Sequence, residues 1–243
     1  MKHFKAIAFV AISAIVLGLN IGAATQSRAQ TASQEAAGFV ENLGTQAAVL
    51  LAPGAGNGPA KQRAALRNLI RDSFNLELTS QFVLGKFWNE ATVAQRDEFQ
   101  DLFTEYLLNN YVRHIGNYKA ETLTVIGSNV VGDRDVLVAT SIESLDGQTN
   151  PVWRVRVSDG GDYKIIDISV DGVSLALTQR REFASVVNRR GLDGLLNMLR
   201  EKLAAQAKAA QWAPRKDASH YSLLASILAS PNANKIGILL AVK

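Results

Sequence analysis

The sequence predicts an α+β fold, in which a four-stranded antiparallel sheet carries helices on one face and the two layers enclose an apolar cavity. Apolar residues recur at helical spacing before Tyr118, the period changes to two after it, and helical spacing returns after Val170. Helices that precede and follow a block of antiparallel strands are typical of this class. Hydrophobic residues make up 47% of the 243 residues, which is enough to form a sizeable core.

Three helices are predicted before the strands. The first covers residues 36–51, and the second begins at Pro59, a residue that suits the first turn of a helix. The glycine-rich segment between them, residues 53–58, lacks the Gly-Lys-Ser/Thr ending of a phosphate-binding loop, so we interpret it as a connector. The third helix begins at Thr92, where Thr92 and Gln95 have the spacing of a capping box. Its apolar face comprises Phe99, Leu102, Phe103, Tyr106, Leu107 and Tyr111.

Four segments rich in β-branched residues predict the strands: 121–128, 133–144, 151–158 and 163–170. Turn residues at 127–129, 146–147 and 159–161 separate them, which favours antiparallel hairpins. Within the strands, Val136, Val138, Thr140 and Ile142 share one face, and so do Trp153, Val155 and Val157. Arg154 and Arg156 alternate with the latter, so we expect one apolar and one solvated sheet face. Two further helices are predicted at 182–187 and 192–203.

The composition excludes several chemistries. Without Cys, the chain has no disulfide, thiol nucleophile or thiolate metal site, and only three His are present. Asp97, Asp101 and Glu105 recur at intervals of four on the polar side of the third helix, where acidic residues are usually solvated rather than metal-bound. We therefore expect no metal and no other cofactor.

The first 29 residues predict a secretory signal peptide. Two lysines precede an uncharged run from Ala6 to Ala24, and Ser27-Arg28-Ala29 places small residues at the usual cleavage positions, so we expect cleavage after Ala29 and export. A membrane anchor is the alternative interpretation of the same run. Cleavage lowers the formal charge from +4 to +1, and residues 30–200 alone carry −3. Nucleic acid is therefore not an expected partner, because such binding needs clustered cations.

Several ordered motifs resemble those of the MlaC/toluene-tolerance family, which includes the hopanoid-associated HpnM branch. They are Phe82-Val83-Leu84-Gly85-Lys86-Phe87-Trp88, Ala91-Thr92-Val93-Ala94-Gln95-Arg96, Tyr163-Lys164-Ile165-Ile166-Asp167, Asp171-Gly172-Val173-Ser174-Leu175 and Arg190-Gly191-Leu192-Asp193-Gly194-Leu195. The resemblance implies a periplasmic protein without catalytic residues. Such a protein holds phospholipid acyl chains and moves them between an outer-membrane lipoprotein complex and an inner-membrane ABC transporter complex. It also implies a lipid-binding domain over residues 30–205.

Face periodicity selects the expected lipid-binding residues. We place the cavity between the apolar sheet face and the third helix, lined by Phe103, Leu107, Tyr111, Trp153, Val155, Val173 and Leu175. Each of these is also an ordinary core residue by its pattern alone. Two arginine pairs are the candidates for contact with a phosphate head group or an acidic partner, because guanidinium groups bind such anions bidentately. They are Arg180, Arg181, Arg189 and Arg190.

Two alternatives stay open at this level. A hopanoid-associated accessory protein would share these motifs and prefer hopanoids to phospholipids. A small cavity enzyme of the ketosteroid-isomerase type would use Asp167 as a base, although this residue also suits a hydrogen-bonding role at the end of a strand. We expect no enzymatic activity.

Residues 206–243 match none of these motifs, and the apolar stretches at 221–229 and 236–242 are too short to span a bilayer. We interpret this segment as a poorly ordered extension. Deletion of residues 211–243 is therefore expected to leave thermal stability and lipid retention unchanged. A large loss of either quantity, measured by thermal unfolding and lipid extraction, would contradict this interpretation.

Overall fold

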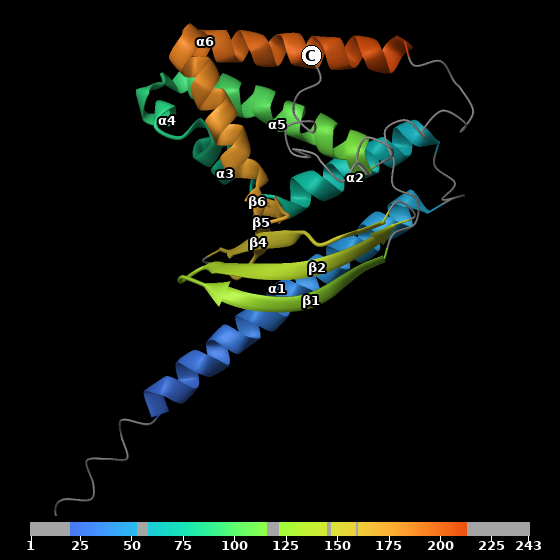
Figure 1. The fold of residues 1–243 in the computed structure, drawn as a ribbon, viewed down its shortest axis with the longest axis vertical. Helices are drawn as coiled ribbons and strands as arrows, with labels where there is room; N and C mark the ends of the chain where they lie inside the picture. Colours follow the sequence, from blue (N-terminus) through green and yellow to red (C-terminus); the bar gives the residue numbers. More distant parts are fainter. Residues whose placement is uncertain (1–19, 53–57, 116–121, 145–146, 159, 213–243) are drawn as a thin grey trace, which may run out of the picture.

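The computed structural model describes residues 20–52, 58–115, 122–144, 147–158 and 160–212 (Figure 1). The helices are α1 (Asn20–Leu51), α2 (Pro59–Ser73), α3 (Leu76–Leu84), α4 (Phe87–Glu90), α5 (Val93–Ile115) and α6 (Leu175–Trp212). The strands are β1 (Thr122–Val131), β2 (Asp135–Ser144), β3 (Gly147–Thr149), β4 (Val152–Val157), β5 (Tyr163–Val170) and β6 (Val173–Ser174). The predicted α+β class is confirmed.

The sheet is antiparallel and has the order β1-β2-β4-β5-β6, with β3 paired to β2. The four predicted strands correspond to β1, β2, β4 and β5, and the structure adds the short β3 and β6. The register places Val136 opposite Val155 and Val138 opposite Trp153, so the predicted apolar face is continuous across β2 and β4.

The predicted turn at residues 127–129 is wrong. These residues belong to β1, and the pairing with β2 shifts at Ile126, which is left out of the register as a bulge. The chain turns instead at Gly132, whose φ of 67° lies in the left-handed region that favours glycine. A glycine within a strand can mark a bulge as well as a turn, and the sequence pattern at Gly127 does not distinguish the two.

Helices α1 and α2 lie against the apolar face of the sheet, and α5 packs against α2. Their inward side chains and those of β2, β4 and β5 form a continuous core, which we call the sheet cluster. Its buried members are Ala36, Val40, Leu43, Leu66, Ile70, Phe74, Leu108, Val112, Val136, Val138, Val155 and Ile165. Helix α1 lies close against β1 at Gly44, where an added Cβ would come within 2.9 Å of the Leu123 side chain.

A second core lies among α3, α4, α5 and α6, and we call it the helical cluster. Its buried members are Val83, Leu84, Phe87, Phe99, Phe103, Tyr106, Leu107, Ala176, Phe183, Val187, Leu195, Leu196 and Leu199. At its centre, the Phe99 and Phe103 rings stack with centroids 5.6 Å apart, and Phe183 meets both edge-on. The predicted apolar face of residues 99–111 therefore contributes mainly to this cluster.

Helix α5 is buried on two sides. Leu107 belongs to the helical cluster, whereas the next residue, Leu108, is fully buried in the sheet cluster together with Val112. A single predicted apolar face did not include Leu108 and Val112. The capping box at its start is confirmed, since Thr92 N donates to Gln95 Oε1 and Gln95 N donates to Thr92 Oγ1.

Helix α3 was not predicted, although its end signals are present in the sequence. Asn75 caps it by accepting a hydrogen bond from Leu78 N, and Gly85 ends it with a φ of 63°. The segment before it joins the sheet edge: Phe74 forms a bridge with Ile165, and Asn75 N donates to Ile165 O at 2.9 Å. This contact attaches the start of α3 to β5.

The two helices predicted after the strands are parts of α6, which bends at Gly191 (Figure 1). Its φ of 71° and ψ of 175° interrupt the helical geometry. The helix continues past the predicted boundary at residue 205 as far as Trp212, and Gln206 exchanges hydrogen bonds with Asn109 and Asn110 of α5. Residues 213–243 of the predicted extension lie outside the described residues.

The predicted signal segment is described only in part. Residues 1–19 lie outside the described residues, and residues 20–29 form the first turns of α1. Cleavage after Ala29 stays a prediction. Among the residues that the structure describes, no helix combines the length and the apolar character needed to cross a membrane.

A buried carboxylate, that of Asp135, lies on the solvated side of the sheet. The side chain of Asp135 is 4% exposed and accepts hydrogen bonds from Arg154 Nε at 2.7 Å and Arg156 Nε at 2.6 Å. Burial opposes its ionisation, but the hydrogen bonds from Arg156 and Arg154 outweigh this effect, so the pKa of Asp135 lies below its ordinary value. The carboxylate therefore stabilises the folded state above the unfolded pKa of about 3.9, and this stabilisation is lost as the pH falls through the lower folded pKa.

We expect Asp135→Asn to lower the free energy of unfolding by about 1–3 kcal/mol at pH 7, because it removes a buried charge that two arginines contact. The difference between the variant and the wild type should shrink as the pH is lowered below about 4. Urea unfolding at several pH values measures both quantities. A difference that does not change with pH would contradict the role given to the charge.

Candidate functional site

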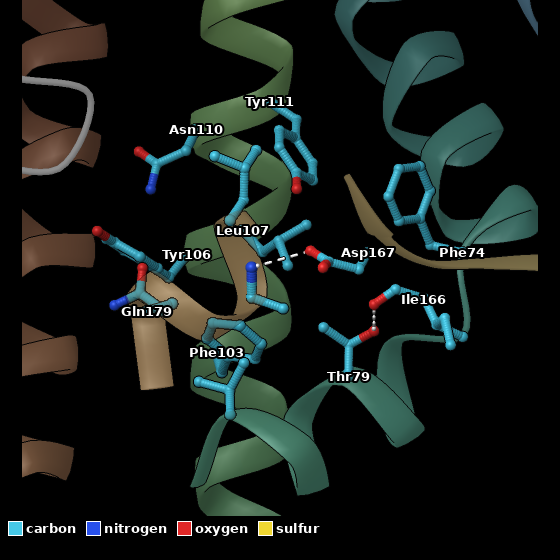
Figure 2. A pocket seen from close by; sticks show the side chains of 13 residues that line it. Phe74, Thr79, Phe103, Tyr106, Leu107, Asn110, Tyr111, Ile166, Asp167 and Gln179 are labelled. Atoms are coloured by element: carbon cyan, nitrogen blue, oxygen red, sulfur yellow. Dashed lines mark hydrogen bonds between the residues drawn. The ribbon is translucent and has the colours of Figure 1, made fainter. Parts of the chain in front are cut away.

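A small pocket lies where the helical cluster meets the sheet cluster (Figure 2). Helices α3, α5 and α6 and the middle of β5 form its walls. The lining residues are Phe74, Thr79, Val83, Phe103, Tyr106, Leu107, Asn110, Tyr111, Ile166, Asp167, Leu175, Ala176 and Gln179. Its volume is about 70 Å³, far below the roughly 300–1,000 Å³ of pockets that hold drug-sized ligands.

The wall from α5 follows from helical geometry. Phe103, Tyr106, Leu107, Asn110 and Tyr111 have the spacing i, i+3, i+4, i+7 and i+8, so one stripe of the helix faces the pocket. In α3, Thr79 and Val83 are four residues apart and face the same space. The Thr79 hydroxyl donates chiefly to Asn75 O at 2.8 Å and also lies 3.3 Å from Ile166 O, which places this wall beside β5.

The first turn of α6 is held by two caps. Ser174 Oγ accepts the N–H of Leu177, and Asp167 Oδ1 accepts the N–H of Ala176, both at 3.0 Å (Figure 2 shows the second). Asp167 Oδ1 also accepts the N–H of Ile168 at 2.8 Å. A carboxylate at a helix N-terminus satisfies a free backbone N–H and interacts favourably with the helix dipole. Asp167 thereby fixes Leu175 and Ala176 at the pocket wall.

Tyr111 is the titratable neighbour of Asp167 in this pocket. Burial raises the pKa of its phenol, and the negative charge of Asp167 raises it further. Tyr111 therefore stays protonated at physiological pH and contributes its ring to the pocket, where it packs on Phe74 with centroids 5.6 Å apart.

The structure brings together four of the seven predicted lipid-binding residues. Phe103, Leu107, Tyr111 and Leu175 line the pocket. Val155 is instead fully buried in the sheet cluster, and Trp153 packs against that cluster while its indole N–H donates to Thr140 Oγ1. Val173 is 38% exposed on β6. The role of all seven in lipid binding stays a prediction.

The sequence reading missed most of the α3 and α6 walls. Thr79 and Val83 lie on the helix that was not predicted, and Ala176 and Gln179 follow Leu175 in the first turns of α6. The cap signal at Asn75, followed by apolar residues ending at Gly85, is the pattern that could have identified α3. No comparable signal distinguishes Ala176 from any other small helical residue.

The arginine pairs occupy separate places along α6. The Arg180 guanidinium lies over the Phe82 ring, 5.0 Å from its centroid, whereas Arg181 is exposed. Arg189 and Arg190 are exposed beside the bend at Gly191, nine residues or about 13 Å further along the helix axis. Their role in head-group or partner contact stays a prediction.

The structure also shows the surroundings of the residues considered for catalysis and for metal binding. Asp167, the residue considered as a base, lies in the pocket, but one of its oxygens accepts two backbone N–H groups. Of the three acidic residues of α5 considered for metal binding, Glu105 pairs with Arg67 at 2.5 Å and Arg71 at 3.2 Å. Within the part of the chain that the structure describes, no three His, Cys, Asp or Glu side chains lie together in a way that could hold a metal ion.

Comparison with known proteins identifies the family. A model of the MlaC protein family matches residues 47–201, which is more than half of the chain. The chain belongs to the MlaC family. Every pocket-lining residue lies within the matched MlaC segment. The predicted resemblance is thus confirmed.

Two curated relatives agree with this assignment. The intermembrane phospholipid transport system binding protein MlaC of Haemophilus influenzae is 24% identical over 149 residues, covering 59% of this chain and 69% of the relative. The toluene tolerance protein ttg2D of Pseudomonas putida is 25% identical over 141 residues, covering 57% of this chain and 66% of the relative.

A solved structure shares the fold. The phospholipid-binding protein from Ralstonia solanacearum, solved in complex with a phospholipid, matches with a TM-score of 0.63 and 25% sequence identity. The match covers 71% of this chain and 98% of that protein. The arrangement of helices on an antiparallel sheet is therefore common to this MlaC-family chain and a structure that contains a bound phospholipid.

We expect Asp167→Ala to lower the free energy of unfolding by about 1 kcal/mol, because the variant leaves the Ala176 N–H without its cap. Asp167→Asn keeps an oxygen acceptor and should lose less. Urea unfolding of both variants at pH 7 measures the difference. Equal losses in the two variants would show that the cap is not what Asp167 contributes.

Proposed function

We propose that this chain is a periplasmic lipid carrier, which holds phospholipid acyl chains and moves them between an outer-membrane lipoprotein complex and an inner-membrane ABC transporter. The observation that supports this proposal most directly is the pocket at the boundary of the two clusters. Its lining is mainly apolar, and it lies inside the segment that matches the MlaC family. The Ralstonia protein, named as phospholipid-binding and solved with a phospholipid, gives the proposal its ligand class.

The energetics favour a carrier that buries acyl chains. Each CH₂ group removed from water contributes about 0.8 kcal/mol, so every part of an acyl chain inserted among apolar side chains recovers a share of the free energy lost on leaving a membrane. The apolar lining includes Phe74, Val83, Phe103, Leu107, Ile166, Leu175 and Ala176. A transfer of this kind needs apolar surface and no reacting group.

The volume of about 70 Å³ is too small for a diacyl lipid, so the proposal includes an opening of the pocket. We place the opening along the boundary between the two clusters. Leu76 and Tyr111 pack against both clusters, and α5 contributes buried side chains to each. Separation along this line would expose apolar side chains to the acyl chains and would leave each cluster intact.

The ligand class is tested by native mass spectrometry followed by lipid extraction from the protein, purified from the envelope of its own cell. We expect a bound diacyl phospholipid. Recovery of hopanoids in preference to phospholipids would support the accessory-protein alternative. An empty protein would contradict the carrier.

The pocket itself is tested by a matched pair of substitutions on α5. Leu107→Phe places extra volume beside the pocket, so we expect a folded protein with several-fold lower phospholipid occupancy. Leu108→Phe adds the same volume on the side of α5 that faces the sheet cluster, where Leu108 is fully buried without lining the pocket. The control should lose about 1–3 kcal/mol of stability from overpacking and keep its lipid when folded.

Lipid occupancy is measured by native mass spectrometry and stability by urea unfolding. Equal occupancy in wild type and Leu107→Phe would argue against acyl chains beside Leu107. Lower occupancy in Leu108→Phe alone would place the lipid on the sheet side of α5.

A further inference from the structure

Three exposed apolar residues lie on α3, β6 and the start of α6, beside the pocket. Phe82 of α3 is 43% exposed, and Val173 and Leu177 at the start of α6 are each 38% exposed. Single exposed apolar residues are ordinary, but these three lie on neighbouring elements, since α3 packs against α6 and β6 leads directly into it. The inner faces of the same elements contribute Val83, Leu175 and Ala176 to the pocket.

Two guanidinium groups accompany these residues. Arg180 lies over the Phe82 ring, and its side chain also passes Gly85, where an added Cβ would come within 2.8 Å of Arg180 Nε. Arg181 is exposed and is four residues after Leu177, so the two share a helix face. The neighbouring Glu182 accepts a hydrogen bond from Gln179 and interacts with Lys202, so its carboxylate is engaged elsewhere. We call the set Phe82, Val173, Leu177, Arg180 and Arg181 the α3–α6 patch.

We propose that the α3–α6 patch docks on an anionic phospholipid surface. The patch combines apolar side chains, which enter the boundary between head groups and acyl chains, with guanidinium groups that bind lipid phosphates. The inference deepens the proposed function, because it names the surface by which a lipid carrier meets a membrane. It also places the pocket wall formed by Leu175 and Ala176 next to that surface.

The size of the patch favours a membrane over a protein partner. A specific interface between two proteins buries about 800 Å² on each side and involves about 20–30 residues. Five side chains supply only a small part of such an interface. A lipid surface needs no matching shape, and each cation near an anionic surface strengthens binding about fivefold.

The test uses the full chain, purified without further processing after expression. The protein is mixed with two kinds of vesicle. One contains phosphatidylcholine alone, and in the other about a third of the lipid is phosphatidylglycerol. We expect sedimentation to show binding at least about fivefold tighter to the anionic vesicles, and this difference should fall as salt is added.

Matched variants locate the binding surface. Leu177→Ser combined with Arg181→Glu changes two exposed residues of the patch, and Val49→Ser combined with Arg63→Glu makes a comparable change on α1 and α2. We expect the patch variant to bind anionic vesicles at least about tenfold more weakly, and the control to bind like the wild type. Phe82→Ser should weaken binding as well. All variants share one N-terminus, so its contribution cancels.

Equal vesicle binding by the patch variant and the control would overturn the proposal, and so would equal binding of the wild type to both kinds of vesicle. If the wild type ignores vesicles while the patch variant loses lipid exchange with a partner protein, the patch belongs to a protein interface instead. Native mass spectrometry reads lipid occupancy separately. An empty protein that still binds through the patch would refute the carrier and leave the docking surface standing.

Discussion

The two-sided burial of α5 is the constraint on which the rest of the structure depends. Phe99, Phe103 and Leu107 pack with α3, α4 and α6 on one side, and Leu108 and Val112 pack into the sheet cluster, beside α2, on the other. Because one helix supplies both cores, the line where they meet must run along it. The pocket lies on this line, and five of its lining residues come from α5.

The other walls are placed by polar contacts with β5. The backbone of Asn75 and the hydroxyl of Thr79 attach the start of α3 to Ile165 and Ile166, and Asp167 caps the start of α6. Helices α3 and α6 therefore both begin beside the middle of β5. This arrangement satisfies helix-terminal N–H groups with the polar groups of a sheet edge, and it leaves apolar side chains facing the space between them. A lipid carrier needs both features, because hydrogen-bonded helix ends must hold apolar side chains around a space that can take an acyl chain.

The far ends of the helices are joined differently. Arg67 binds both Glu105 and Asn109, and Gln206 exchanges hydrogen bonds with Asn109 and Asn110. This polar network links α2, α5 and α6 at the partly exposed margin of the pocket, where Asn110 is a lining residue. At a partly exposed margin, water can replace the partner in a hydrogen bond, so these contacts break more readily than buried apolar contacts do. The boundary between the clusters is thus closed by contacts that differ in kind from those inside each cluster.

The sequence by itself determined the fold class, the family and the faces of single elements. The capping box at Thr92, the stripe from Phe99 to Tyr111 and the alternation around Val155 all depend on local periodicity, which the structure preserves. Only the tertiary structure decided which apolar residues line the pocket and which fill a core. Val155 and Leu107 have equally apolar patterns, yet Val155 lies opposite packed helices and Leu107 lies beside the pocket. Sequence periodicity shows on which face of its own helix or strand a residue lies. What that face packs against depends on segments that are distant in the sequence, so only the tertiary structure shows it.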